Sequence, residues 1–132
     1  MLLSVARAYH RTVNRSTVAA WLPVVLWAGL IFALSSVPAL NSGLGGWDLP
    51  LRKLAHVTEF AVLGALLLRA TDSARASIVI GVLYALSDEI HQHFVTQRTG
   101  AGLDVVIDTV GVLVGVWVAM HVQAHVAARE PA

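Results

Sequence analysis

Two carboxylates and two imidazoles follow directly after an uncharged, mostly apolar run. The run covers residues 78–86, and Asp88, Glu89, His91 and His93 come next. A carboxylate beside an imidazole is the usual equipment for general acid–base chemistry, and both groups also bind metal ions. Burying them in an apolar environment costs free energy unless they have partners. These residues therefore predict either a paired structural cluster or a functional site.

The composition indicates what surrounds these groups. The 132-residue sequence is 57% hydrophobic and 13% charged, with a mean hydropathy of +0.72, whereas about a quarter of the residues in soluble domains are charged. Long uncharged runs recur, which predicts an all-α, multi-pass membrane protein without a separate soluble domain. The net charge of +1 gives no indication for or against nucleic-acid binding, and for a membrane bundle we expect no nucleic-acid partner. The sequence contains no cysteine, which excludes disulfides and thiolate sites.

Four apolar segments are expected to cross the membrane as helices. They cover residues 18–40, 52–70, 76–94 and 103–126, with a Gly-rich loop at 41–50. The first segment is longer than the roughly 7 to 15 apolar residues of a secretory signal, so we expect it to remain as a span. A transmembrane domain at 18–126 then lies between a basic segment at 1–17 and a tail at 127–132.

The distribution of lysine and arginine predicts the orientation. With the N-terminus inside, six of these residues fall in cytoplasmic segments and three fall outside. The six are Arg7, Arg11, Arg15, Arg69, Arg75 and Arg129, and the three are Arg52, Lys53 and Arg98. Because cytoplasmic loops carry the excess of positive charge, we expect both termini in the cytoplasm and the protein in the plasma membrane.

Three carboxylates are expected at the same depth in this bundle. At a rise of ~1.5 Å per residue, Glu59, Glu89 and Asp108 each lie ~8 to 9 Å inward from the same end of the bundle. In the predicted orientation this layer falls in the outer half of the bilayer. The opposite half is almost purely apolar.

Helical periodicity places the polar residues on shared faces. Lys53, His56 and Glu59 fall on one side of the second helix. On the third helix, one face carries Tyr84, Asp88, His91 and Gln92, with Glu89 and His93 at its flanks. On the fourth helix, Asp104 and Asp108 align with Gly111 and Gly115, a small-xxx-small pattern that allows close approach of a neighbouring helix. The polar faces are thus predicted to converge.

Two interpretations of the polar layer stay open. In the first, Lys53 or Arg98 pairs with nearby carboxylates to limit the roughly 2.5 to 3.5 kcal/mol cost of each charge in the membrane. In the second, the layer binds a ligand, because a bundle that only needed stability could use Leu and Gly instead. The candidate ligand-binding residues are Lys53, His56, Glu59, Asp88, Glu89, Gln92, Arg98, Asp104 and Asp108.

Catalysis and metal binding are weighed on the same residues. The candidate acid–base residues are His56, Glu59, Asp88, Glu89 and His91. No nucleophile motif such as GxSxG accompanies them, and Ser35 and Ser36 are expected to hydrogen-bond to backbone or site residues. The HxxE and ExH spacings differ from the HExxH of metalloproteases, so we predict neither a metal nor another cofactor.

Four stretches together resemble the VanZ-like family of small bacterial membrane proteins. They are FALSSVP at 32–38, KxxHxxEF at 53–60, LYALSDEIHQHFV at 83–95 and QRTGAGLDVVIDTVGVLVG at 97–115. The resemblance implies that Lys53, His56, Glu59, Asp88, Glu89, Gln92, Arg98 and Asp104 match the family's polar signature. At position 108 the family pattern usually has Asn, whereas this chain has Asp108. For the family's namesake, the resemblance implies resistance to teicoplanin, but it supplies no reaction.

The leading hypothesis is a bundle that engages a lipid-linked or envelope ligand, such as a glycopeptide antibiotic or a cell-wall precursor, from the outside. An intramembrane acid–base or metal-dependent enzyme that acts on a lipid is the first alternative, and a structural or partner-binding protein is the second. A proton-coupled transporter is disfavoured, because the ionisable groups stop halfway across. Oligomeric state is left open.

Overall fold

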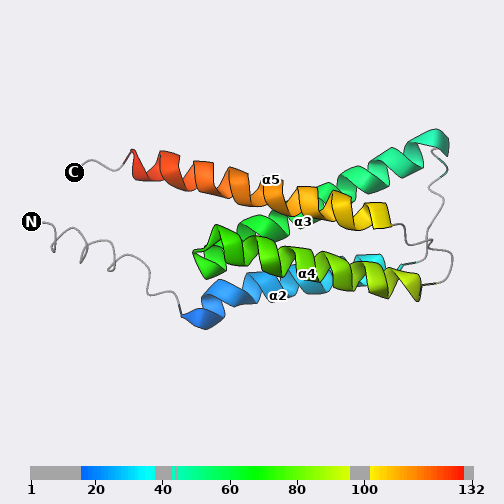
Figure 1. Ribbon diagram of the computed structural model, residues 1–132, viewed down its shortest axis with the longest axis horizontal. Coiled ribbons are helices and arrows are strands. Elements are labelled where there is room, and N and C mark those ends of the chain that lie inside the picture. The colour runs from blue at the N-terminus through cyan, green and yellow to red at the C-terminus, as the bar shows by residue number, and fades with distance from the viewer. Residues whose placement is uncertain (1–15, 38–42, 44, 96–101, 130–132) are drawn as a thin grey trace, which may run out of the picture.

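The computed structural model describes residues 16–37, 43, 45–95 and 102–129. Within these ranges the chain forms four α-helices, α2 (Thr17–Ser35), α3 (Asp48–Thr71), α4 (Ala74–His93) and α5 (Gly102–Ala127). A short 3-10 helix, η1 (Gly45–Trp47), precedes α3. Successive helices alternate in direction, so α2 and α4 run opposite to α3 and α5 (Figure 1). The prediction of an all-α bundle is confirmed.

The first helix is shorter than the apolar run that predicts it. It begins after Ser16, whose side chain accepts a hydrogen bond from the backbone N–H of Ala19 at 3.2 Å, and it ends at Ser35 rather than extending to residue 40. The Ser36 hydroxyl donates to the Phe32 carbonyl at 2.7 Å. The same carbonyl accepts the backbone N–H of Ser36 at 3.0 Å, so both donors of Ser36 close the last turn of the helix.

The prediction that residues 48–50 belong to a loop is wrong, because α3 begins at Asp48. The Asp48 carboxylate lies in the first turn, where the helix dipole favours negative charge. Pro50 is tolerated there because the first N–H groups of a helix have no helical acceptor. The helix therefore starts before its apolar run.

A tight connection joins α3 to α4. Asp72 adopts the left-handed conformation with φ 51°, and its N–H donates to the Leu68 carbonyl at 2.9 Å. Ser73 then caps α4 by accepting from the N–H of Ala76 at 3.2 Å. Asp and Asn tolerate the left-handed region better than most residues, so this short link reverses the chain without an inserted glycine.

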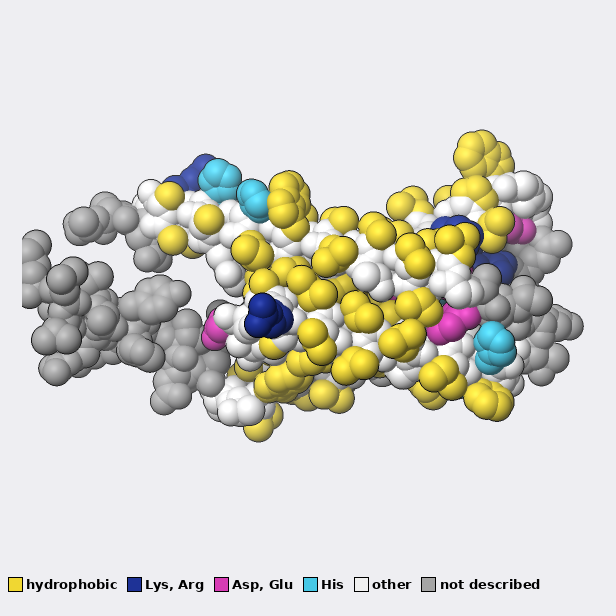
Figure 2. All heavy atoms as spheres, in the orientation of Figure 1, with side chains coloured by type: hydrophobic (Ala, Val, Ile, Leu, Met, Phe, Trp, Pro, Cys, Tyr) yellow, Lys and Arg dark blue, Asp and Glu magenta, His cyan; other side chains and the backbone are white. Residues whose placement is uncertain are grey.

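Helix α3 lies at the centre, in contact with each of the other helices. The core contains Ile31 of α2, Phe60 and Leu67 of α3, and Val112 and Val116 of α5, none more than 3% exposed. Many other large apolar side chains face outward, and they cover the middle of the bundle in Figure 2. Soluble proteins rarely expose so large an apolar surface.

Three glycines bring the backbones of α3 and α5 into contact. A Cβ added to Gly111 would lie 2.6 Å from the Val57 carbonyl oxygen, and one added to Gly64 would lie 2.5 Å from that of Val112. A Cβ on Gly115 would overlap the backbone of Ala61. These positions therefore accept only glycine unless the two helices separate.

Three of the described helices are long and apolar enough to cross a membrane. They are Thr17–Ser35, Gly45–Thr71 (α3 with η1) and Gly102–Ala127, with mean hydropathies of 2.1, 1.4 and 2.0. Helix α4 is not among them, because six polar residues occupy its last seven positions. These are Ser87, Asp88, Glu89, His91, Gln92 and His93.

Candidate functional site

Polar side chains from all four helices meet at the end of the bundle where α3 and α5 begin. Charged and histidine side chains are visible at this end, on the right of Figure 2. We use the name polar cluster for Ser35, His56, Asp88, Gln92 and Asp108. Four of them are at most 3% exposed, and the His56 side chain is 12% exposed.

Asp88 is held by two hydrogen bonds to one of its oxygens. Its Oδ2 accepts from the Ser35 hydroxyl at 2.9 Å and from Gln92 Nε2 at 2.7 Å. Gln92 lies one turn beyond Asp88 on α4, whereas Ser35 comes from the end of α2. The other oxygen, Oδ1, is buried and has no hydrogen-bond partner. The carboxylate is thus fixed in orientation but only half satisfied.

His56 and Asp108 form the second contact of the polar cluster. His56 Nδ1 lies 3.2 Å from Asp108 Oδ1, although neither atom has a hydrogen-bond partner of good geometry. The glycine contact explains their proximity, because Gly111, one turn after Asp108, lies against Val57. One ligand atom from each of His56, Asp88 and Asp108 lies within 4.8 Å of the other two.

An ion pair lies at the rim of this site. Lys53 Nζ donates to Asp104 Oδ1 at 3.0 Å, and the two side chains are 32% and 24% exposed. Lys53 therefore pairs with Asp104, as the first of the two interpretations expects. It does not pair with Asp88 or Asp108 in the polar cluster. Arg98, the other predicted cation, lies outside the described residues.

The remaining polar residues of α4 lie around the polar cluster. Both oxygens of Glu89 are buried and lack a hydrogen bond, and the nearest His93 nitrogen is 3.9 Å away. The His93 side chain itself is 65% exposed. His91 shares a hydrogen bond of 2.8 Å with the Ser36 hydroxyl and stacks on Phe32, with ring centroids 4.0 Å apart. His91 thus contacts α2 rather than the buried carboxylates.

Two aromatic residues that the sequence left without a polar role tie α2 to the site helices. Trp27 Nε1 donates to the backbone carbonyl of Glu59 at 2.8 Å, and the Tyr84 hydroxyl donates to the carbonyl of Ala28 at 2.5 Å. Buried Trp and Tyr usually find a partner for their polar atom, and that rule is the sequence signal that could have identified them. The Glu59 side chain is half-buried on α3.

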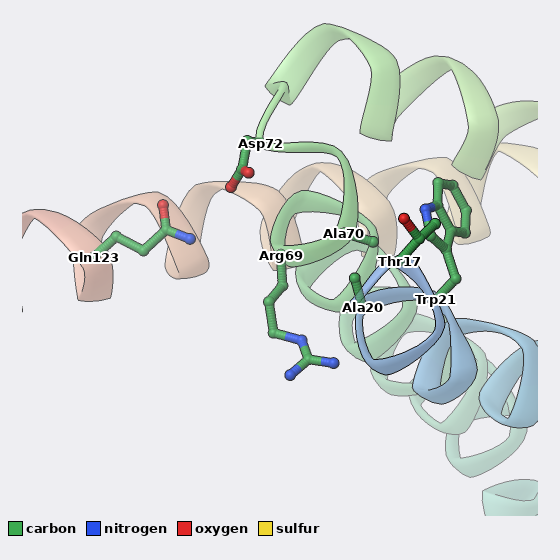
Figure 3. A pocket seen from close by; sticks show the side chains of 7 residues that line it. All are labelled: Thr17, Ala20, Trp21, Arg69, Ala70, Asp72 and Gln123. Carbon is green, nitrogen blue, oxygen red and sulfur yellow. The ribbon is translucent and has the colours of Figure 1, made fainter. Parts of the chain in front are cut away.

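A cavity of about 360 Å³ lies at the opposite end of the bundle. It is lined by Thr17, Ala20, Trp21, Arg69, Ala70, Asp72 and Gln123, as Figure 3 shows. Arg69 donates through Nη2 to the Ala19 carbonyl at 3.1 Å. That carbonyl lacks its helical donor because Pro23, four residues on, has no N–H. The Arg69 side chain therefore replaces the backbone hydrogen bond that α2 lacks at Pro23.

The comparison with known families draws on nearly the whole chain. The profile of the VanZ/LLP1 family matches residues 2–123. The chain belongs to this family. The predicted resemblance is confirmed, and the match agrees with three helices able to span a membrane in identifying a VanZ-family membrane protein. No curated protein and no solved structure matches the chain.

The arrangement permits two kinds of chemistry in this VanZ-family protein. Buried acceptor atoms on Asp88 and Asp108 can receive hydrogen bonds or bind a cation that enters the polar cluster. The His56 imidazole beside Asp108 can exchange a proton with a bound group. Both require a ligand at the end of the bundle where α3 and α5 begin.

Proposed function

We propose that this protein crosses the plasma membrane four times and binds the polar head of a lipid-linked or other envelope ligand at the polar cluster. The observation that carries the proposal is the burial of Asp88 and Asp108, which are 2% and 1% exposed, each with one oxygen that lacks a hydrogen-bond partner. Such atoms cost free energy in a bundle built only for stability. A ligand with hydroxyl or amine donors would satisfy them.

Helix α4 supplies the fourth span in this proposal. Its 20 residues extend ~30 Å, which is the thickness of the hydrocarbon core. The polar residues Asp88 and Gln92 face the bundle interior, whereas Leu83 and Ile90 are 60% and 63% exposed. The hydropathy of α4 is low because its polar groups lie inside, and its outward surface suits lipid.

The proposed orientation has both termini in the cytoplasm and the polar cluster in the outer half of the bilayer. The beginning of α2 and the end of α5 lie at the same end of the bundle (Figure 1), which also carries Arg69, Arg75 and Arg129. Cytoplasmic segments carry the excess of positive charge. Reporter fusions after residues 72 and 132 should therefore read cytoplasmic, and fusions after 45 and 98 should read external. A cytoplasmic reading at 98 would overturn an outward-facing site.

Recognition of the ligand divides between the rim and the interior. Lys53, partly exposed beside Asp104, is placed to meet an anionic group such as phosphate or carboxylate. The free oxygens of Asp88 and Asp108 are placed to accept from hydroxyl or ammonium groups deeper in the site. Teicoplanin-like lipoglycopeptides and cell-wall precursors carry such groups on an apolar tail.

Binding can be measured with purified protein in lipid nanodiscs. Teicoplanin and a polyprenyl diphosphate that carries an amino sugar are the probes, because both offer hydroxyl or amine donors, and isothermal titration gives the affinity. We expect at least one probe to bind wild type and Asp72→Asn equally, because Asp72 lies at the opposite end, and to bind Asp88→Asn at least about tenfold more weakly, since a charge-assisted hydrogen bond is lost. No binding of either probe, or equal binding to Asp88→Asn, contradicts the proposal.

An intramembrane enzyme is the second candidate, and the contact between His56 Nδ1 and Asp108 Oδ1 at 3.2 Å favours it. A carboxylate next to an imidazole orients the ring and supports its role as a general base. Purified protein incubated with a panel of envelope lipids should then release a product, and His56→Ala should abolish that release. Binding without turnover across the panel would leave the binding function alone.

A further inference from the structure

The closest grouping of metal-binding side chains among the described residues comes from three different helices. His56 lies on α3, Asp88 on α4 and Asp108 on α5, and their ligand atoms are all within 4.8 Å of one another. Metal ligands at ~2.1 Å from one tetrahedral ion are ~3.4 Å apart. The 3.2 Å between His56 Nδ1 and Asp108 Oδ1 matches that spacing closely.

A second observation is that each of the three side chains has a buried polar atom without a hydrogen-bond partner. These atoms are Asp88 Oδ1, Asp108 Oδ1 and His56 Nδ1. Asp88 and Asp108 are 2% and 1% exposed. Buried polar atoms without partners are rare, and an ion that satisfies them is one of the accepted explanations. A cation held by one ligand atom from each of the three side chains would supply partners for these carboxylates and for the imidazole.

The surroundings of Asp88 resemble the outer shell of a metal site. Ser35 and Gln92 both donate to Asp88 Oδ2, at 2.9 and 2.7 Å, which leaves Oδ1 for the interior. Ligating carboxylates are commonly held by such hydrogen bonds, which fix their orientation. The nearest described lysine, Lys53, is bound to Asp104 at 3.0 Å and so does not neutralise the two buried carboxylates.

We propose that His56, Asp88 and Asp108 bind one divalent transition-metal ion inside the bundle. One imidazole and two carboxylates form a mixed nitrogen and oxygen set, which suits Zn²⁺, Mn²⁺ or Fe²⁺ better than the oxygen-only sites of Mg²⁺ and Ca²⁺. Three protein ligands leave a position for an outside group. If the proposed ligand binding holds, the ion replaces the direct hydrogen bonds from the ligand to Asp88 and Asp108, and that position faces an anionic group of the ligand.

This site requires the tertiary fold, because its ligands are separated by 32 and 20 positions along the chain. The close contact of α3 with α5 at Gly111 brings His56 to Asp108, and α4 supplies Asp88 from the third side. No spacing within one helix could have indicated this set.

The test is metal binding by the full chain, purified without a histidine tag and stripped with EDTA. Dialysis against Zn²⁺ or Mn²⁺ followed by elemental analysis should return one ion per chain. Asp108→Asn and His56→Ala should bind neither metal stoichiometrically. Ser35→Ala, which removes an outer-shell hydrogen bond, should bind roughly tenfold more weakly. Asp72→Asn and His121→Ala, changed at the opposite end of the bundle, should bind like wild type.

Cobalt gives an independent readout. Co²⁺ bound by one imidazole and two carboxylates should absorb in the visible range, and the band should vanish in His56→Ala while circular dichroism shows an intact helical fold. Wild-type protein that retains no metal, or Asp108→Asn that binds as tightly as wild type, overturns the proposal. Binding of teicoplanin or polyprenyl diphosphate is then measured with and without EDTA, which separates the metal site from the proposed function. Binding that survives EDTA shows that the ion takes no part in ligand recognition, and it leaves the proposed function intact.

Discussion

The two ends of the bundle use polar residues in opposite ways. Where α3 and α5 begin, buried polar groups bond across helices, as Ser35 does to Asp88 over 53 positions of sequence. At the other end the bonds are mostly local, as between Thr71 and Ser77. Local bonds build a turn, whereas the long-range ones hold several helices around unsatisfied carboxylates. The difference agrees with the proposal that the end where α3 and α5 begin binds a ligand, whereas the hydrogen bonds at the other end hold the α3–α4 turn.

The largest effect should come from the glycine contact that aligns α3 with α5. Gly115→Leu places a side chain against the backbone of Ala61, and such overpacking should destabilise the bundle by about 3 kcal/mol or more. Unfolding in mixed micelles, followed by circular dichroism, measures the loss. Gly29→Leu is the matched control, since a Cβ there has nothing within 4 Å. Equal stability of the two variants would show that the helices are free to separate.

At the opposite end of the bundle, replacement of Arg69 should lower the stability of the fold. Arg69→Met leaves the Ala19 carbonyl without a donor from the protein, because Pro23 supplies none, and the loss of one hydrogen bond costs about 0.5 to 1.5 kcal/mol. The same unfolding assay measures it. In the Pro23→Ala background the helix provides its own N–H, so the cost of Arg69→Met should fall to near zero. A cost that is unchanged by Pro23→Ala would exclude this explanation.

In the polar cluster, neutralisation of the Asp88 carboxylate should stabilise the metal-free protein. Asp88→Asn keeps an acceptor for Ser35 and Gln92 and replaces a buried carboxylate that is only half satisfied with a neutral amide. We expect the metal-free protein to gain about 1 kcal/mol while losing ligand binding. Thermal unfolding in EDTA, compared with Asp72→Asn, measures the gain. A loss of stability would mean that Asp88 is structural.

The smallest effect is expected at the rim. Lys53→Met breaks the ion pair with Asp104, which is partly exposed, and exposed pairs contribute about 0 to 1 kcal/mol. Stability should therefore change little, while the affinity for an anionic probe such as a polyprenyl diphosphate should fall. Lys53→Arg should retain most of it. A large stability loss with unchanged affinity would assign Lys53 to folding.

Hydrophobic periodicity was enough to predict the helices. Long apolar runs bounded by Ser, Pro and Gly fixed their number and approximate positions. The start of α3 was missed because Asp48 and Pro50 are typical of turns, yet both are well suited to a first helical turn. Helix ends depend on such local capping, which apolar periodicity does not report.

The site could be predicted as a set of residues but not as a geometry. Depth along the helices predicted one layer for Glu59, Glu89 and Asp108, and the helix faces added His56 and Asp88 to the candidate residues. Which carboxylate meets which imidazole depends on how closely two helices approach, and Gly111 determines that distance. The sequence aligned Gly111 with Asp108 on one helix face, but it could not identify α3 as the partner helix.

The contact between α3 and α5 also constrains how the protein assembles. In the proposed four-span bundle α5 comes last in the chain, so Gly111 and Gly115 reach α3 after the other helices. Until then His56 and Asp88 lack Asp108 as a neighbour. A nascent chain released before α5 has inserted would expose those groups to lipid, where they are costly, and such a truncated product should be a good substrate for membrane quality-control proteases.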